Sequence, residues 1–194
     1  MSAPLPPSQF ALRSRLLHWL MAAMILTMLF IGVAMVASLA EYHRLVSIHR
    51  PLGIAVLLLA IIRLINRRFS KLPPFPPTMS ARERKIASRS EHLLYALMIA
   101  QPLVGWAMLS AGHYPVVMFG AVSLPPILPA NPTLYAILRP AHTILAFLFF
   151  AMILAHVSAV LFHTLIIRDR LLDRMALWPT RRSGSAGDDE TMRQ

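Results

Sequence analysis

The sequence predicts an all-α protein that spans a membrane as a four-helix bundle. Hydrophobic residues make up 57% of the 194 residues and charged residues only 14%, whereas a soluble domain carries roughly a quarter charged residues. Three long stretches contain no Asp, Glu, Lys or Arg, namely residues 16–40, 92–138 and 140–167. A bilayer core needs about 20 apolar residues per helix, so each stretch is long enough to cross it.

The first two helices are predicted at residues 16–38 and 46–66. The first apolar run is about twice as long as the usual core of a signal peptide, so we expect it to be retained. Arg50 and Pro51 fall in the first turns of the second helix. A proline is tolerated there because the first turn has no internal partner for its N–H.

A composition break at residues 67–89 predicts a solvated connector. It combines seven cationic side chains with a proline-rich segment at 73–77, which is typical of stiff, exposed chain. Ser90 is the expected N-cap of a third helix that runs to about residue 110, and Glu91 would complement its dipole.

The last predicted helix covers residues 141–167, or begins near 133 if Pro140 lies at a kink. Before it, residues 116–128 form an apolar loop segment that can lie in the membrane interface or cover the bundle. The chain then divides into a cytoplasmic N-terminus at 1–15, a transmembrane domain at 16–179 and a tail at 180–194. The tail is polar, so we expect it to be disordered.

The distribution of lysine and arginine predicts the orientation. Of 19 such residues, 16 lie in the N-terminal segment, in residues 63–91 or in the C-terminal segment from residue 168, and the others are Arg44, Arg50 and Arg139. By the positive-inside rule, both termini and the connector are cytoplasmic. The net charge of +11 therefore reflects topology and contact with anionic lipids. We expect no nucleic-acid partner.

Histidine is the main candidate for holding a metal or cofactor. The chain has no Cys, which excludes disulfides, thiolate iron–sulfur clusters and covalent c-type haem. It has eight His, and ligand-capable residues within membrane helices are functional candidates because burying them is costly. His43 and His113 lie in outer loops, where a solvent-facing side chain is expected.

Spacing suggests two histidine pairs at two depths. His142 and His156 are 14 residues apart on the fourth helix, which places them on nearly the same face with a rise of roughly 21 Å. His49 would lie opposite His142 near the outer face, and His18 opposite His156 near the inner face. Two imidazoles on opposite sides of a porphyrin make a six-coordinate electron-transfer haem, and four helices can wrap such cofactors.

The residues alone also allow a second way of pairing the inner histidines. His163 follows His156 by seven residues on nearly the same face and could pair with His18 by depth. His92, at the cytoplasmic start of the third helix, is a further competitor. A histidine at a helix end can also face lipid headgroups or bond a haem propionate.

Four features together resemble the bacterial cytochrome b561 family, over about residues 10–179. They are the 142-to-156 histidine spacing and the stretches Leu17-His18-Trp19-Leu20, Ile48-His49-Arg50-Pro51-Leu52-Gly53 and Pro102-Leu103-Val104-Gly105-Trp106. The resemblance implies a bundle in the bacterial inner membrane with two b haems. It also implies ubiquinone near the cytoplasmic haem, with His163 and Arg15 as candidate contacts. The resemblance implies that His49 and His142 are the ligands of the outer haem and that His18 and His156 are the ligands of the inner haem. It thus favours His156 over His163 as the partner of His18.

The resemblance further implies an oxidoreductase that takes electrons from periplasmic superoxide and passes them to ubiquinone. The outer cations Arg44, Arg50 and Arg139 could attract an anionic donor, anchor the interface or pair with haem propionates. One alternative is a cytochrome b subunit that receives electrons from a periplasmic dehydrogenase or hydrogenase. Another is a haem-free transporter or assembly protein, although the helices offer no intramembrane Asp or Glu for a proton relay.

Overall fold

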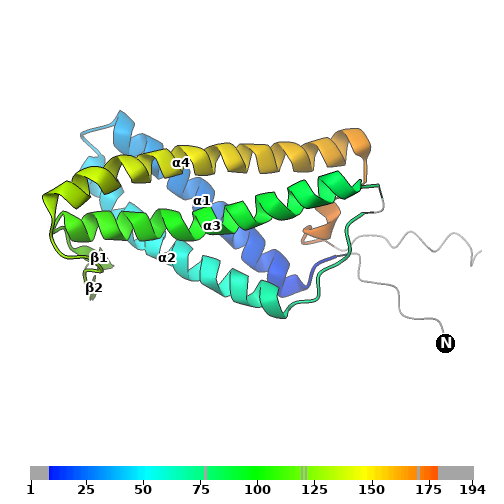
Figure 1. Cartoon of the computed structure of the whole chain (residues 1–194), viewed down its shortest axis with the longest axis horizontal. Coiled ribbons are helices and arrows are strands. Elements are labelled where there is room, and N and C mark those ends of the chain that lie inside the picture. The colour runs from blue at the N-terminus through cyan, green and yellow to red at the C-terminus, as the bar shows by residue number, and fades with distance from the viewer. Residues whose placement is uncertain (1–8, 77, 119, 121, 170, 179–194) are drawn as a thin grey trace, which may run out of the picture.

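The computed structural model describes residues 9–76, 78–118, 120, 122–169 and 171–178. Four long helices lie alongside one another in a bundle (Figure 1). All four are long and apolar enough to cross a membrane, which confirms the predicted all-α, four-helix class. Their bounds are α1 Leu12–Ala37, α2 Tyr42–Phe69, α3 Ala81–Ala111 and α4 Pro132–Leu161.

Helix α2 begins earlier than predicted, so Pro51 is not in its first turns. The helix starts at Tyr42, and Pro51 is a buried residue of its interior. A proline is tolerated within a membrane helix because neighbouring groups can satisfy the carbonyl that loses its partner. The polar residues before Pro51 concealed this extension, because they interrupt the apolar pattern from which the helix was predicted.

Helix α3 also begins earlier, at Ala81, and the prediction of Ser90 as its N-cap is wrong. Ser80 is the N-cap, and it forms a reciprocal capping box with Glu83, which satisfies two backbone donors at the helix start. Ser90 lies inside the helix, where its hydroxyl donates to the Ala87 carbonyl. Residues 82–89 are therefore helical, and the connector between α2 and α3 is correspondingly short.

Helix α4 begins at the earlier of the two predicted positions. The Asn131 side chain accepts a hydrogen bond from the Leu134 N–H as its N-cap, and Pro140 lies within the helix. The helix continues into a π-helical segment, η1 (Phe162–Ile167). Arg168 then adopts a left-handed conformation with φ 59°, and a short 3₁₀ turn follows, η2 (Leu172–Arg174).

The loop before α4 contains a β-hairpin that the sequence did not predict. Strands β1 (Val116–Met118) and β2 (Val122–Leu124) pair antiparallel, with Val116 opposite Leu124. Val116 is buried, and β1 packs against α2. The apolar loop thus covers part of the bundle, one of its two expected positions.

The helices pack in the order α1, α2, α3 and α4. Helix α1 packs along α2, α2 along α3, and α3 along α4, whereas α4 makes few close backbone approaches to α1 or α2. The core lies halfway along the bundle, with Met21, Ala60, Met98 and Phe149 among its buried residues. Phe149 is the buried residue of α4.

The two described ends of the chain lie at the same end of the bundle as the α2–α3 connector. The Phe10 N–H donates to the Arg174 carbonyl, and the Arg174 guanidinium donates to the Pro74 carbonyl. We call this the connector end, comprising residues 9–15, 70–76, 78–80, 168–169 and 171–178. The opposite, hairpin end comprises the α1–α2 turn, the hairpin and the start of α4 (Figure 1).

Candidate cofactor sites

Two pairs of histidine rings face each other at the two ends of the bundle. At the hairpin end, His49 of α2 and His142 of α4 have ring centroids 6.3 Å apart. At the connector end, His18 of α1 and His156 of α4 have centroids 6.5 Å apart. The structure therefore brings together the two combinations that the 14-residue spacing suggested.

These separations fit one metal ion held between two imidazoles. A metal–imidazole nitrogen bond is about 2 Å long, so two rings on opposite sides of one ion have centroids roughly 6 Å apart. Among the described residues, no three or more His, Cys, Asp or Glu side chains gather around a common point. The remaining ligands of such an ion would have to come from a molecule such as a macrocycle.

The helices that carry each pair do not pack closely against each other. Helix α4 contributes one ring to each pair, yet its backbone makes few close approaches to α1 or α2. His156 is exposed, although it lies within an apolar helix. The buried core of the described residues lies in the middle of the bundle, between the two pairs.

Helix α3 packs closely on the His142 ring through a glycine. A Cβ added to Gly105 would lie 3.0 Å from the ring atom Cε1 of His142. The Gln101 amide nitrogen lies 3.3 Å from His142 Nε2 and donates to the His142 carbonyl. The Nδ1 atoms of His49 and His142 are buried and have no hydrogen-bond partner among the described residues. These two unpaired ring nitrogens fit the expectation that a further group binds at this pair.

A half-buried cation lies beside the other pair. Arg63 Nη1 is 3.2 Å from Nδ1 of His18, and its guanidinium lies over the Tyr95 ring, 5.6 Å from the centroid. Arg63 is half-buried, as expected for a charged residue near a helix end. Sequence reasoning did not connect it to His18, although its isolation in an apolar helix was a usable signal.

The two candidate quinone contacts lie at the connector end but bind different partners. His163 is buried, and its Nδ1 lies 2.6 Å from Asp169 Oδ2. Arg15 donates to the Ala176 carbonyl at 2.6 Å and to Gln9 Oε1 at 3.2 Å. The structure shows no direct contact between His163 and Arg15 among the described residues. Asp169 is a site residue that the sequence analysis missed.

The alternative histidine ligand, His92, and the three outer arginines each contact groups other than the paired histidine rings or are exposed. His92 is exposed, and its Nδ1 contacts the carbonyl of Ser88. Arg44 forms an exposed ion pair with Glu41. Arg50 donates to the Pro115 carbonyl of the hairpin loop, and Arg139 is exposed on α4.

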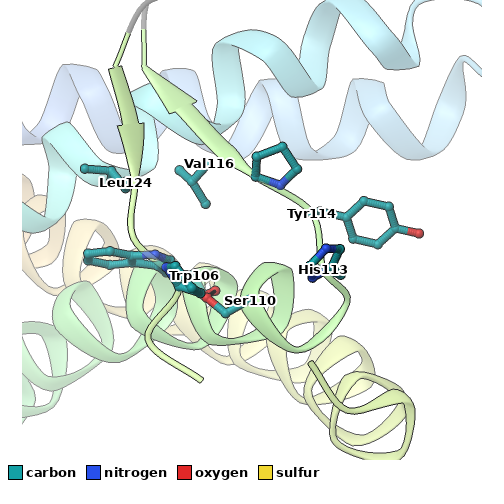
Figure 2. A pocket seen from close by; sticks show the side chains of 8 residues that line it. Trp106, Ser110, His113, Tyr114, Val116 and Leu124 are labelled. Carbon is teal, nitrogen blue, oxygen red and sulfur yellow. Dashed lines mark hydrogen bonds between the residues drawn. The ribbon is translucent and has the colours of Figure 1, made fainter. Parts of the chain in front are cut away.

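A hollow lies at the hairpin end between α3 and the hairpin (Figure 2). Trp106 and Ser110 of α3 line one side, and Val116 and Leu124 of the two strands line the other. The Trp106 indole donates to the Pro125 carbonyl, and the Ser110 hydroxyl accepts from the Ile127 N–H. These bonds attach the hairpin to α3 over the end of the bundle that holds His49 and His142.

Four apolar helices with histidine pairs at two depths define an integral membrane bundle of the kind found in membrane cytochromes b. The prokaryotic cytochrome b561 family matches residues 9–177. The chain belongs to this family. It is therefore an inner-membrane electron-transfer protein of a family that binds haem b, typically two haems.

Curated relatives agree with this assignment. Cytochrome b561 homolog 2 of Escherichia coli (strain K12) is 28% identical over 173 residues, which cover 87% of this chain and 92% of the relative. Probable superoxide oxidase CybB of Yersinia pestis is 31% identical over 128 residues, covering 66% and 72%. Cytochrome b561 homolog 1 of Escherichia coli (strain K12) is 28% identical over 168 residues, covering 82% and 92%.

Proposed function

We propose that this protein carries electrons across the membrane from superoxide at the hairpin end to ubiquinone at the connector end. The observation that carries the proposal is the pair of facing histidines at each end of the bundle, 6.3 and 6.5 Å apart. A membrane electron carrier needs redox sites near both faces. Helix α4 spans the distance between them and contributes a histidine to each.

The proposed haem ligands are His49 with His142 at the hairpin end and His18 with His156 at the connector end. Haem bound between two imidazoles supplies one-electron transfer with no open position for oxygen. The chain itself holds the rings at the required separation. It also carries these rings on helices that are long and apolar enough to cross a membrane.

The donor is proposed to be superoxide because a relative carries the name of a superoxide oxidase and because the hairpin end bears exposed cations. Arg139 is exposed, and Arg50 lies next to His49 in the sequence. A positive field near a redox site attracts an anionic donor. In balance, two superoxide anions become two dioxygen molecules, and one ubiquinone takes two electrons and two protons to become ubiquinol.

The acceptor is proposed to bind at the connector end, near His18 and His156. His163 and Arg15 are the proposed contacts for its oxygens. Most lysines and arginines lie in segments at this end, so we propose that it faces the cytoplasm, together with both termini. The protons for ubiquinol would then come from the cytoplasmic side.

The first test is the visible spectrum and the haem-to-protein ratio of the detergent-purified chain. We expect two haems with a reducible b-type spectrum, and His142→Ala and His156→Ala should each remove about one. His92→Ala is the matched control, since that exposed ring contacts the Ser88 carbonyl of its own helix and is not paired with another histidine among the described residues. A colourless protein, or haem content unaffected by both ligand substitutions, would overturn the ligand assignment.

The second test separates superoxide oxidation from a different source of electrons. In the second candidate function, the chain is the cytochrome b subunit of a periplasmic dehydrogenase or hydrogenase. The exposed hairpin favours it, because Val122 is 58% exposed at the end where such a partner would dock. Purified protein that reduces ubiquinone with superoxide alone supports the first function. Haem that superoxide does not reduce, together with a co-purifying redox enzyme, supports the second.

A further inference from the structure

The end of α4 is built around a buried histidine–carboxylate pair. The helix ends in the π-helical segment η1, and π-helical turns occur frequently at functional sites. Arg168 then turns the chain back with φ 59°, and the Asp169 N–H donates to the His163 carbonyl. This turn brings Asp169 Oδ2 to 2.6 Å from Nδ1 of His163.

The Asp169 carboxylate is enclosed and held in place from several sides. Its side chain is only 2% exposed. Its Oδ1 accepts from the Leu171 N–H, and the Thr78 hydroxyl from the α2–α3 connector donates weakly to Oδ2 at 3.4 Å. The carboxylate fixes the proton of a neutral His163 on Nδ1 and stabilises the doubly protonated ring. The second nitrogen, Nε2, makes no hydrogen bond among the described residues and is free to exchange a proton.

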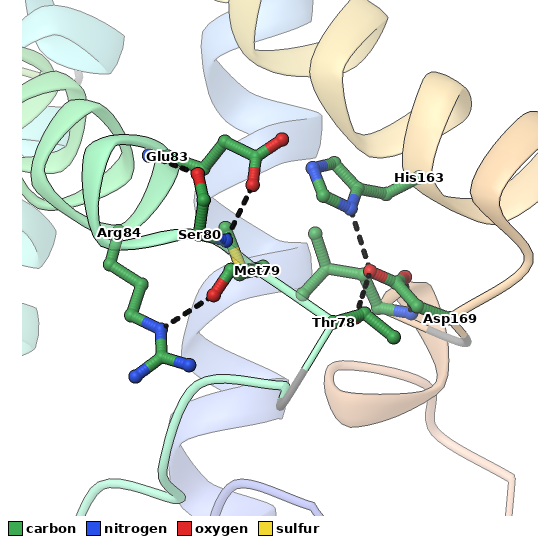
Figure 3. Close-up of polar contacts among 8 residues, drawn as sticks. Thr78, Met79, Ser80, Glu83, Arg84, His163 and Asp169 are labelled. Carbon is green, nitrogen blue, oxygen red and sulfur yellow. Dashed lines mark hydrogen bonds and ion pairs between the residues drawn. The ribbon is translucent and has the colours of Figure 1, made fainter.

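A second carboxylate lies on the other side of the His163 ring. Figure 3 shows Glu83 at the start of α3, facing the ring from the side opposite Asp169. It is close enough to interact electrostatically with His163, and it accepts from the Ser80 N–H at 2.7 Å within the capping box. Glu83 remains in contact with solvent. The three side chains thus run from the solvent-accessible start of α3 to the buried end of α4.

We propose that His163 is the proton donor to the reduced quinone, that Asp169 is its positioning residue, and that Glu83 returns protons to it from water. This inference rests on the proposed function, which supplies the quinone and its electrons. As the quinone accepts electrons, its oxygen takes the proton from Nε2: an O–H bond forms, the N–H bond breaks, and the ring becomes neutral. Glu83 or water then restores the proton. Asp169 keeps its charge throughout.

Among the described residues, Arg174 is a further charged group next to the pair, and its cation interacts electrostatically with Asp169. Its guanidinium also donates to the Pro74 carbonyl of the connector. Arg174 cannot serve as the proton donor because an arginine stays protonated in proteins. Its position holds the C-terminal segment against the connector and so closes the surroundings of Asp169.

The test uses the purified full-length protein with haem bound and reduced, mixed rapidly with the soluble quinone ubiquinone-1. The rate is read from the decay of the reduced b-type spectrum. General acid catalysis contributes typically 10²–10⁴-fold, so Asp169→Asn should slow reoxidation by about 100-fold at unchanged haem content. The variant should also show an altered pH profile and a larger slowing in D₂O. Asp169→Glu should retain most of the rate, and Glu41→Gln, in an exposed ion pair at the opposite end of the bundle, is the control.

A further pair of variants tests whether the residues act as a unit. His163→Gln and the double variant should be about as slow as Asp169→Asn, because removing either member disables the same step. The inference is overturned if Asp169→Asn reacts at the wild-type rate, or if it slows only in proportion to lost haem. If reduced wild-type protein is not reoxidised by ubiquinone-1, the quinone function fails and this inference fails with it. If the wild type is reoxidised by ubiquinone-1 and Asp169→Asn reacts equally fast, this inference is rejected and the proposed quinone function stands.

Discussion

At the scale of single residues, Gly105 decides how closely α3 approaches the hairpin-end pair. An added Cβ would lie 3.0 Å from the His142 ring, so Gly105→Ala should push the ring out of line with His49. We expect the purified variant to lose about half of its haem, measured as the haem-to-protein ratio.

Gly32→Ala is the matched control for this substitution. An added Cβ at Gly32 meets nothing within 4 Å, and alanine is the better helix former by about 1 kcal/mol. Haem content should therefore stay at the wild-type level. Equal haem content in both variants would show that the His142 ring tolerates the added methyl group, contrary to the proposed site.

Arg63 bears on the redox potential of the connector-end site. Its cation lies 3.2 Å from the His18 ring, and a nearby positive charge favours the reduced, less positive form of a bound haem. Arg63→Gln should lower the midpoint potential of one haem by on the order of 50–100 mV. Redox titration of the visible spectrum measures this shift.

The control for Arg63 is Arg68→Gln, since Arg68 is exposed near the end of α2 and solvent screens its charge. Its substitution should leave both potentials unchanged. An equal shift in the two variants would mean that the effect arises from net charge and not from the contact with His18.

At the scale of elements, the start of α3 depends on its capping box. Ser80 accepts from the Glu83 N–H and Glu83 accepts from the Ser80 N–H. Losing such a cap costs about 1 kcal/mol, so Ser80→Ala should increase hydrogen exchange at residues 81–88. Ser90→Ala is the control, because that hydroxyl donates only to a carbonyl one turn earlier. Equal exchange in the two variants would contradict the cap.

The elements also show what the sequence could and could not predict. Four helices followed from apolar length, because only a helix satisfies its own backbone in a membrane. Their starts were misplaced where polar residues extend a helix beyond its apolar run, as at Tyr42 and Ala81. The contact between Asp169 and His163 depends on the left-handed turn at Arg168, which composition and periodicity do not indicate.

Histidine pairs at two depths, in contrast, were predicted from helix periodicity and chain direction alone. Successive membrane helices run in opposite directions, so sequence position translates into depth. That reasoning could not choose between His156 and His163 without the family resemblance. In the structure, His156 faces His18, whereas His163 bonds Asp169. Their roles as haem ligands remain a prediction for the variants above to test.

At the scale of the whole molecule, the orientation in the membrane can be tested because the chain has no Cys. Single cysteines introduced at two exposed positions should be labelled from opposite sides by an impermeant thiol reagent. We expect Ser123→Cys, on the hairpin, to be labelled in spheroplasts, and Lys71→Cys, at the connector end, only after the membrane is opened. The reverse pattern would overturn the proposed cytoplasmic connector end.

The position of α4 in the chain has a consequence for biosynthesis. Each histidine pair takes one ring from α4, and α4 emerges from the ribosome after α1, α2 and α3. Neither site can form while only the first three helices are inserted, so cofactor loading has to follow translation of most of the chain. With haem at the proposed sites, a product interrupted before α4 would remain colourless, whereas a product that includes α4 would acquire the visible spectrum.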